Sequence, residues 1–245
     1  MEKNPFILNL IAFALIIVIP TTLKSDSRDL FIVWDVGQGQ WTTLLENEKC
    51  IHFDAGGEKA PWPAIRTLCG EQKNVLEISH WDSDHINQIK KLSGNTPLCI
   101  ERTGDLRFAN PKKRKILQTI DRCPKSKKMF WSWSPLLARD ANSSSQVFLV
   151  QGFLIAGDSP KHQEKIWSGL LPKSEKIKVL ILGHHGSRTS TSSILLSRLP
   201  WLKMAIASSR YAKYGHPHLK TRSALRQFQV AMLTTEDWGT IGFEL

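Results

Sequence analysis

Acidic and histidine side chains follow several short apolar runs of this chain, and this repeated order constrains the fold more than any other feature. Each run has the length of a buried strand and ends in a turn that carries glycine, aspartate or histidine. Because a sheet gathers the ends of its strands at an edge, these turns can meet in space. The sequence therefore predicts a sheet-based α+β domain with a polar site at one edge. The predicted strands before such turns are 30–34, 50–53, 75–78, 153–156 and 177–182.

The richest of these turns is Ser79–His85, which reads His-x-Asp-x-Asp-His from His80 onward. Alternate residues of an extended loop point the same way, so His80, Asp82 and Asp84 can converge on one metal site together with His85. Imidazole nitrogen combined with carboxylate oxygen suits zinc, manganese or iron. The alternative is a charged loop that only caps the following helix, with Asp82 or Asp84 as the N-cap residue.

Three later turns carry further candidate ligands. Asp158 follows a glycine at the end of a predicted hairpin, where a carboxylate can bridge two metal ions. His184 and His185 stand between two glycines, and His216 lies in Tyr-Gly-His-Pro-His after another predicted strand. Adjacent histidines in such a turn suit metal binding, proton transfer or phosphate binding better than core packing.

The formal net charge of +11 on 245 residues favours a polyanionic partner, either nucleic acid or an anionic membrane surface. Basic clusters precede Phe130, Trp131 and Trp133, and such groups can neutralise phosphates and stack on bases. The alternative is a solvated helix face beside core tryptophans. The candidate DNA-binding residues are Lys112, Lys113, Arg114, Lys115, Lys127, Lys128, Arg188 and Lys213.

The N-terminal segment is apolar from Phe6 to Ile19. This length fits a signal peptide or, extended to Leu23, a short membrane anchor. We therefore expect a signal peptide or anchor at 1–24, a linker at 25–28 and the folded domain at 29–245. The protein would be exported to the periplasm or anchored to the inner membrane. The four cysteines permit two disulfides, in any of three pairings, or four free thiols if the domain is cytosolic.

Taken in order, these motifs resemble the metallo-β-lactamase superfamily, and most closely the hydrolase-like domain of ComEC-type competence (DNA-uptake) proteins. The resemblance implies a four-layer αβ/βα sandwich with a metal site at one edge. It also implies DNA as a partner and a DNA-uptake channel as a further one. The matching stretches are 35–39 (Asp-Val-Gly-Gln-Gly), 53–56, 79–85, 157–158, 183–187, 214–218 and 235–241.

The resemblance also implies a ligand set for one or two divalent ions, Zn²⁺ or Mn²⁺, with Asp158 shared between them. Asp84, His184 and His185 would act in catalysis, the two histidines facing the reacting group. The first ion would bind Asp84, His85, Asp158 and His216, and the second would bind His80, Asp82 and Asp158.

The chain departs from the family pattern at three places. Gln40 stands where the first motif often ends in Asp, and Asn87 and Gln88 stand where glycines are usual. Ser134, before Pro135, occupies the apparent position of a family histidine, which would weaken the metal site built on His80 and Asp82. This departure leaves open an enzyme with one metal ion or a domain without activity.

Three functions remain after these observations. The first is a metal-dependent phosphodiesterase or nuclease that acts on DNA. The second is a hydrolase of a small ester or an envelope phosphodiester, which needs the same metal ions but no strong positive charge. The third is a non-catalytic DNA-binding module tethered to the membrane, which needs the charge but no tightly bound metal.

Overall fold

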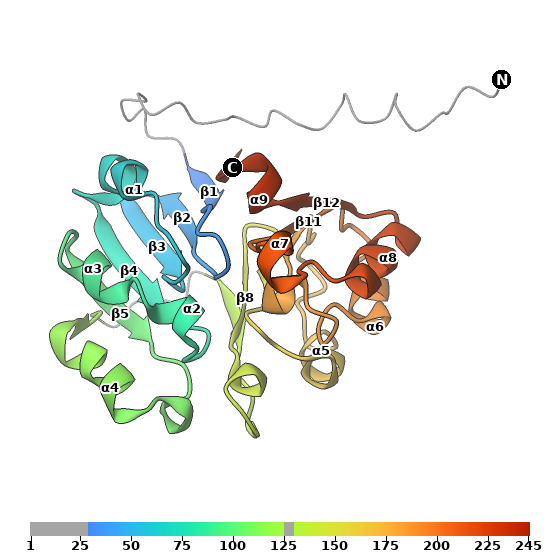
Figure 1. Ribbon diagram of the computed structural model, residues 1–245, viewed down its shortest axis with the longest axis horizontal. Coiled ribbons are helices and arrows are strands. Elements are labelled where there is room, and N and C mark those ends of the chain that lie inside the picture. The colour runs from blue at the N-terminus through green and yellow to red at the C-terminus, as the bar shows by residue number, and fades with distance from the viewer. Residues whose placement is uncertain (1–28, 125–129) are drawn as a thin grey trace.

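The computed structural model describes residues 29–124 and 130–245 (Figure 1). The predicted N-terminal segment 1–24, the linker 25–28 and the candidate DNA-binding residues Lys127 and Lys128 lie outside the described residues. Within the described ranges, no helix has the length and apolar character needed to span a membrane.

Seven strands form the first sheet, in the order β13-β1-β2-β3-β4-β5-β6. Strands β2 and β3 form an antiparallel hairpin, and β3, β4, β5 and β6 run parallel to one another. The strands are β1 Leu30–Val33, β2 Thr42–Glu46, β3 Lys49–Phe53, β4 Lys73–Glu77, β5 Leu98–Arg102, β6 Asp121–Arg122 and β13 Ile241–Glu244. The outer face carries α1 Trp62–Cys69, α2 Ser83–Ile86 and α3 Ile89–Ser93.

Six strands form the second sheet, in the order β12-β11-β10-β9-β8-β7. They are β7 Trp131–Trp133, β8 Val147–Val150, β9 Phe153–Ile155, β10 Val179–Ile181, β11 Met204–Ala207 and β12 Ala231–Thr234. On their outer side lie α5 Lys161–Trp167, α6 Ser193–Ser197 and α8 Leu219–Gln227. The remaining short helices are η1 Leu106–Phe108, α4 Pro111–Arg114, η2 Lys115–Thr119, η3 Asn142–Ser144, η4 Gly183–Gly186, α7 Tyr211–Tyr214 and α9 Thr235–Trp238.

The first strand shows how the layers are built. Successive side chains of a strand point to opposite faces, and in β1 Phe31 and Val33 enter the core between the two sheets. Ile32, with Trp34 just after the strand, enters the core under the outer helices instead. Phe31 also stacks on Phe153 of the second sheet, with ring centroids 3.9 Å apart. Helix, sheet, sheet and helix therefore form the four-layer αβ/βα sandwich that the sequence motifs imply.

The aromatic residues after the second basic cluster pack against the core. Trp131 and Trp133 pack against the apolar cluster of the second sheet. Phe130 meets Phe53 edge-on, at 5.3 Å between ring centroids. This packing leaves the three rings half-buried and favours the alternative of core aromatics over rings that stack on bases.

The four cysteines form two disulfides, Cys50–Cys69 and Cys99–Cys123. The first joins β3 to the end of α1, and the second joins β5 to the residue after β6. Each closes a short loop, with sequence separations of 19 and 24. The cross-links therefore pin the outer elements of the first sheet to its parallel strands.

Replacing Cys99 and Cys123 together by serine should lower the free energy of unfolding by about 2–4 kcal/mol, because the open loop gains entropy in the unfolded chain. Urea denaturation with and without a reducing agent measures this. The unmodified protein should lose more stability on reduction than the double variant, which retains only one disulfide. Equal unfolding free energies for the two oxidised proteins would contradict the prediction.

Candidate metal centre

The loop between β4 and α2 presents its side chains to a site and does not merely cap the helix. Asp82 occupies the N-cap position of α2, yet its carboxylate makes no capping hydrogen bond to the helix. It faces His80 instead, with Asp82 Oδ2 3.6 Å from His80 Nε2. The neighbouring His80 imidazole is the main reason that the pKa of Asp82 lies below its usual value.

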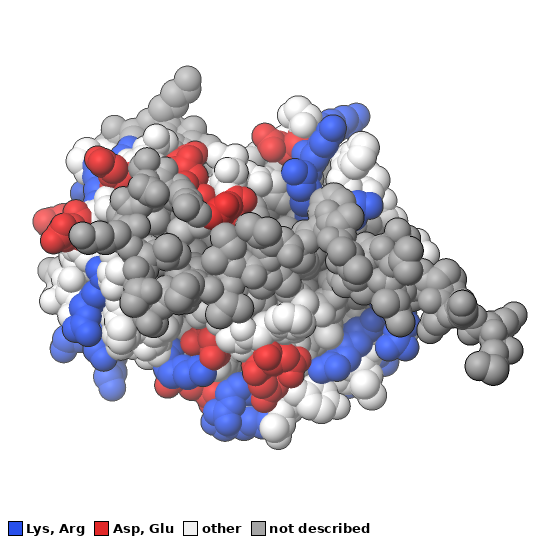
Figure 2. Space-filling view, turned by 90° about the horizontal axis from the view of Figure 1, so that it is seen from above, with Lys and Arg blue, Asp and Glu red and all other residues white. Residues whose placement is uncertain are grey.

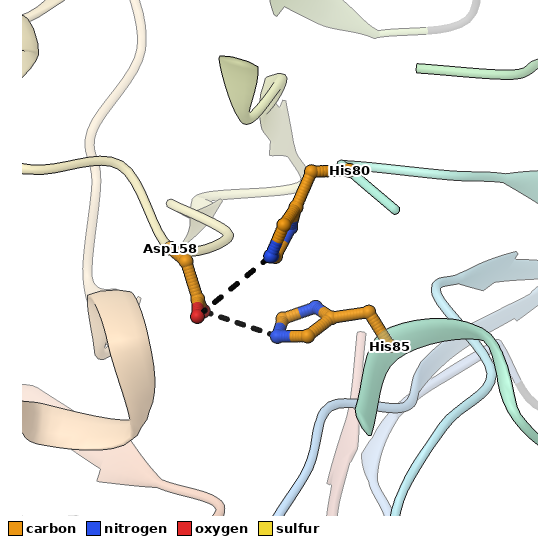
Figure 3. A group of neighbouring side chains, drawn as sticks. All are labelled: His80, His85 and Asp158. Atoms are coloured by element: carbon orange, nitrogen blue, oxygen red, sulfur yellow. Dashed lines mark ion pairs between the residues drawn. The ribbon is translucent and has the colours of Figure 1, made fainter. Parts of the chain in front are cut away.

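Three buried side chains form the centre of the site (Figure 3). His80 and His85 come from the ends of the 79–85 loop, and Asp158 comes from the turn after β9. Figure 3 shows the carboxylate directed at both imidazole rings, with Asp158 Oδ1 3.1 Å from His85 Nε2 and Oδ2 3.8 Å from His80 Nε2. The three residues are at most 3% exposed.

The far side of each imidazole ring fixes which nitrogen faces this centre. His85 Nδ1 lies 2.7 Å from the buried carboxylate of Asp54 and donates to it. Ser79 Oγ donates to Asp54 at 2.6 Å, so it can accept from His80 Nδ1, which is 3.0 Å away. Both histidines are thus oriented with Nε2 toward Asp158. Metal-binding histidines in proteins are held in this way by a partner on their other nitrogen.

A second group contains Asp84, His85 and His185. His185 Nε2 lies 3.1 Å from Asp84 Oδ2, and His185 Nδ1 is 3.0 Å from the carbonyl oxygen of Ser208. The turn η4 brings this ring into the site because His184 and His185 both have left-handed backbones, at φ 50° and 55°. Such conformations are costly for non-glycine residues and concentrate at functional sites.

The chemistry of the central group fits a divalent cation. His80 Nε2, His85 Nε2 and Asp158 Oδ1 are buried atoms that make no hydrogen bond of good geometry among the described residues, although the last two form an ion pair at 3.1 Å. Each such atom costs about 1–3 kcal/mol if nothing satisfies it. One cation that accepts lone pairs from all three would satisfy them together, and two nitrogens with a carboxylate oxygen suit Zn²⁺ or Mn²⁺.

The electrostatics point the same way. Burial disfavours the charged form of Asp158, but the neighbouring His85 and His185 outweigh it and hold the pKa of Asp158 well below its usual value. Burial likewise opposes protonation of His85, yet Asp158 and Asp54 raise its pKa well above the usual value. Two carboxylates thus flank one imidazole and stabilise positive charge between them.

Two histidines that the family pattern assigns to the site lie at its edge. His184 Nε2 is 3.7 Å from Asp158 Oδ2, and 29% of its side chain is exposed. His216 stands beside it, with ring centroids 6.0 Å apart, and its Nδ1 is 3.4 Å from Gln38 Nε2. The structure therefore brings His185, and not His216, into the group with Asp84 and His85.

Ser134 follows β7 and is exposed. None of the hydrogen bonds that the described residues make at the site involves it. Two other residues of this connection reach the site: Asn142 of η3, whose Nδ2 lies 3.5 Å from His184 Nδ1, and Ser145, whose hydroxyl accepts from Asp158 N at 3.0 Å. The proposed replacement of a ligand by Ser134 remains a prediction.

Asp54 was not predicted as a functional residue, although it lies in the stretch 53–56 that resembles the family's second motif. Asp54 is fully buried and accepts from the backbone and hydroxyl of Ser79, from Gln40 Nε2 and from His85 Nδ1. The backbone of Asp54 is left-handed, at φ 58°. The one sequence signal for this residue is its place at the start of an Asp-Ala-Gly-Gly turn directly after a strand.

Glycine allows the first two motifs to support the metal loop at close range. A Cβ on Gly56 would lie 2.3 Å from the carbonyl carbon and oxygen of Asp84. The same approach lets Ala55 N donate to the His85 carbonyl at 2.9 Å and Gln40 N to the Asp84 carbonyl at 3.0 Å. These motifs contribute no residue to either metal-binding group; they fix the backbone of the two ligands.

The basic residues near the site come from three places. Lys113 of α4 donates to the carbonyl oxygen of Trp81 in the metal loop, and Arg188 is exposed just after η4. Lys213 pairs with Glu58 at 2.8 Å. Lys112, Arg114 and Lys115 are exposed around α4. On the face in Figure 2, Lys and Arg stand in separate groups with Asp and Glu between them, so the positive charge is not spread evenly there.

The chain is similar to parts of competence proteins. It is 28% identical over 229 residues to Recombination protein 2 of Haemophilus influenzae, which covers 84% of this chain and 28% of that protein. It is 27% identical to Competence protein ComA of Neisseria gonorrhoeae, over 87% of this chain and 32% of the relative. It is 26% identical to ComE operon protein 3 of Bacillus subtilis, over 76% of this chain and 26% of that relative. This chain therefore spans about a third or less of the curated relatives it matches. No protein-family model matches it.

Solved structures share the fold. The metallo-β-lactamase fold protein YhfI of Bacillus subtilis superposes with a TM-score of 0.55 at 13% identity, over 89% of this chain and all of that one. A diphosphatase from the PhnP family gives 0.51 at 14% identity, over 88% of this chain and 98% of that one.

The chain is thus a metallo-β-lactamase-fold protein with a buried His and Asp centre at the edge of its sheets. Within that class it resembles the hydrolase-like domain of ComEC-type competence proteins, as its motifs predicted.

Proposed function

We propose that this chain is a metal-dependent phosphodiesterase that cleaves DNA in connection with DNA uptake. The observation that carries the proposal is the group of His80, His85 and Asp158, whose buried metal-facing atoms make no hydrogen bond of good geometry among the described residues. A divalent ion bound there would lower the pKa of a bound water and stabilise negative charge on the phosphate.

The chain's own residues would orient the metal ligands and protonate the reacting group. Asp54 and Ser79 bind the Nδ1 atoms of His85 and His80, so that Nε2 of each ring faces the centre. His185 is buried and held by Asp84 and Ser208, whereas His184 is part-exposed beside the centre. We therefore assign to His184 Nε2 the exchange of a proton with the reacting group.

DNA is the proposed substrate because basic residues adjoin the metal loop. Lys113 bonds directly to that loop, and Arg188 follows the paired histidines by three residues. Together with the net charge of +11, they would neutralise phosphates on either side of the scissile bond. We also propose that the domain lies outside the cytoplasm, held at the membrane by the segment 1–24 and working beside a DNA-uptake channel. Two disulfides support an oxidising compartment.

The test is hydrolysis by the purified full-length chain with Mn²⁺ or Zn²⁺. We expect cleavage of DNA that a chelator abolishes and added metal restores, and DNA affinity that falls steeply between about 50 and 200 mM salt. Hydrolysis of bis(p-nitrophenyl) phosphate or a small ester without DNA cleavage would favour a small-substrate hydrolase. DNA binding without metal or hydrolysis would favour the non-catalytic module.

A further inference from the structure

Helix α7 carries both tyrosines of the chain, and both are open to solvent. Tyr211 is 45% exposed and Tyr214 is 42% exposed, and the sequence contains only these two tyrosines. A tyrosine ring contributes most to stability when it is buried. Two half-exposed rings on one four-residue helix therefore suggest a role in binding.

Each ring already has a cation against it. The Arg222 guanidinium lies 4.8 Å from the centroid of Tyr211, and the Lys213 ammonium lies 4.9 Å from that of Tyr214. Cations beside aromatic rings are the combination with which proteins hold single-stranded nucleic acids, where rings stack on bases and cations meet phosphates.

The helix is also tied to the edge of the metal centre. Glu58, from the loop after β3, accepts from Arg210 Nη1 at 2.9 Å, from Lys213 Nζ at 2.8 Å and from the Tyr214 hydroxyl at 3.1 Å. Gln38 links the start of α7 to the loop that follows it, since its Oε1 accepts from Arg210 N and its Nε2 contacts His216. Figure 1 shows α7 near the middle of the molecule, between the two halves of the sandwich.

Tyr214 precedes His216 by two residues, a span of at most about 7 Å of chain. His216 itself stands beside His184, the residue to which we assign proton exchange. A strand held on α7 would therefore start within two residues of a histidine at the edge of the centre.

We propose that Tyr211 and Tyr214 form a stacking platform for unpaired nucleobases, so that the substrate is single-stranded DNA. This inference rests on the proposed phosphodiesterase function for its substrate class. In a duplex the faces of the bases are covered by their neighbours and only their edges are accessible, so flat exposed rings on a short helix cannot engage them. A single strand presents the faces.

The test is binding, measured by fluorescence anisotropy on the full-length chain with two labelled strands of equal length. One carries bases, and the other is an abasic sugar–phosphate strand of the same charge. Because the two strands carry the same charge, the ratio of their affinities removes the contribution of the phosphates and measures the contribution of the bases. We expect the unmodified protein to prefer the strand with bases at least tenfold, and to bind the same sequence as a duplex more weakly.

Changing both tyrosines to alanine should bring this ratio near one, since each stacked ring contributes about 5- to 150-fold. Changing both to phenylalanine should preserve the ratio because the rings remain. The matched control is Trp201→Ala, since Trp201 is a 53% exposed aromatic with Lys176 4.9 Å from its ring, away from α7. Its loss should leave the ratio unchanged.

A ratio near one in the unmodified protein, or a double alanine variant that keeps the full ratio, overturns the platform. So does a double phenylalanine variant that loses as much as alanine, because the Glu58 contact would then be the cause. Hydrolysis is scored separately: absence of cleavage of any DNA defeats the proposed function, while the binding ratio still decides the platform.

Discussion

Replacement of Asp158 by alanine should remove most of the bound metal and reduce hydrolysis to background. Its carboxylate lies within 4 Å of an imidazole nitrogen of each of His80, His85, His184 and His185, and it is the one carboxylate of the group with His80 and His85 among the described residues. Removing a residue that only positions a metal ligand costs 10- to 100-fold in metal affinity, so removing the ligand Asp158 itself should cost more.

Two measurements check the Asp158 prediction. Metal content is determined after dialysis, and the rise in melting temperature on adding Mn²⁺ or Zn²⁺ is followed in parallel, because a ligand at 100 times its Kd stabilises by about 2.7 kcal/mol. The variant should show little metal and no rise. Asp121→Ala is the control, since Asp121 is exposed on the edge strand β6. Unchanged metal content in Asp158→Ala would exclude this centre.

The fold followed from the sequence where local patterns are strong. Continuous apolar runs such as 30–34 predicted their strands correctly because both faces of these strands are buried. Helix α7 escaped prediction because four residues carry no helical periodicity. The packing of the β7 aromatics could not be predicted because it depends on distant residues of the second sheet and its outer helices.

The departures from the family pattern could be interpreted only with the structure. Asn87 stands where glycines are usual, and its side chain both accepts from Gly57 N and donates to Gly57 O, each at 2.9 Å. Gln40 stands where an Asp is often found, and its amide donates to Asp54 at 3.0 Å. Both substitutions thus support the metal loop. A sequence shows such residues as deviations because their partners lie far along the chain.

Asp54 is the strongest test of this support, because it contributes to neither group that could hold an ion. Changing it to asparagine should weaken metal binding 10- to 100-fold without removing it. In Asp54, Oδ2 accepts from three donors and Oδ1 from Ser79 N. An asparagine must set its NH₂ group against at least one of these donors, and a neutral oxygen makes His85 a weaker ligand.

The variant should also lose about 1–3 kcal/mol of stability, since a buried donor is left unpaired. Metal titration separates this loss from the effect on the site: the Kd, measured below the melting temperature, must rise in protein that remains folded. Ser79→Ala should act in the same direction, because it frees His80 Nδ1 and removes one of the four hydrogen bonds to Asp54. If Asp54→Asn binds metal as tightly as the unmodified protein, the orientation of His85 does not depend on this carboxylate.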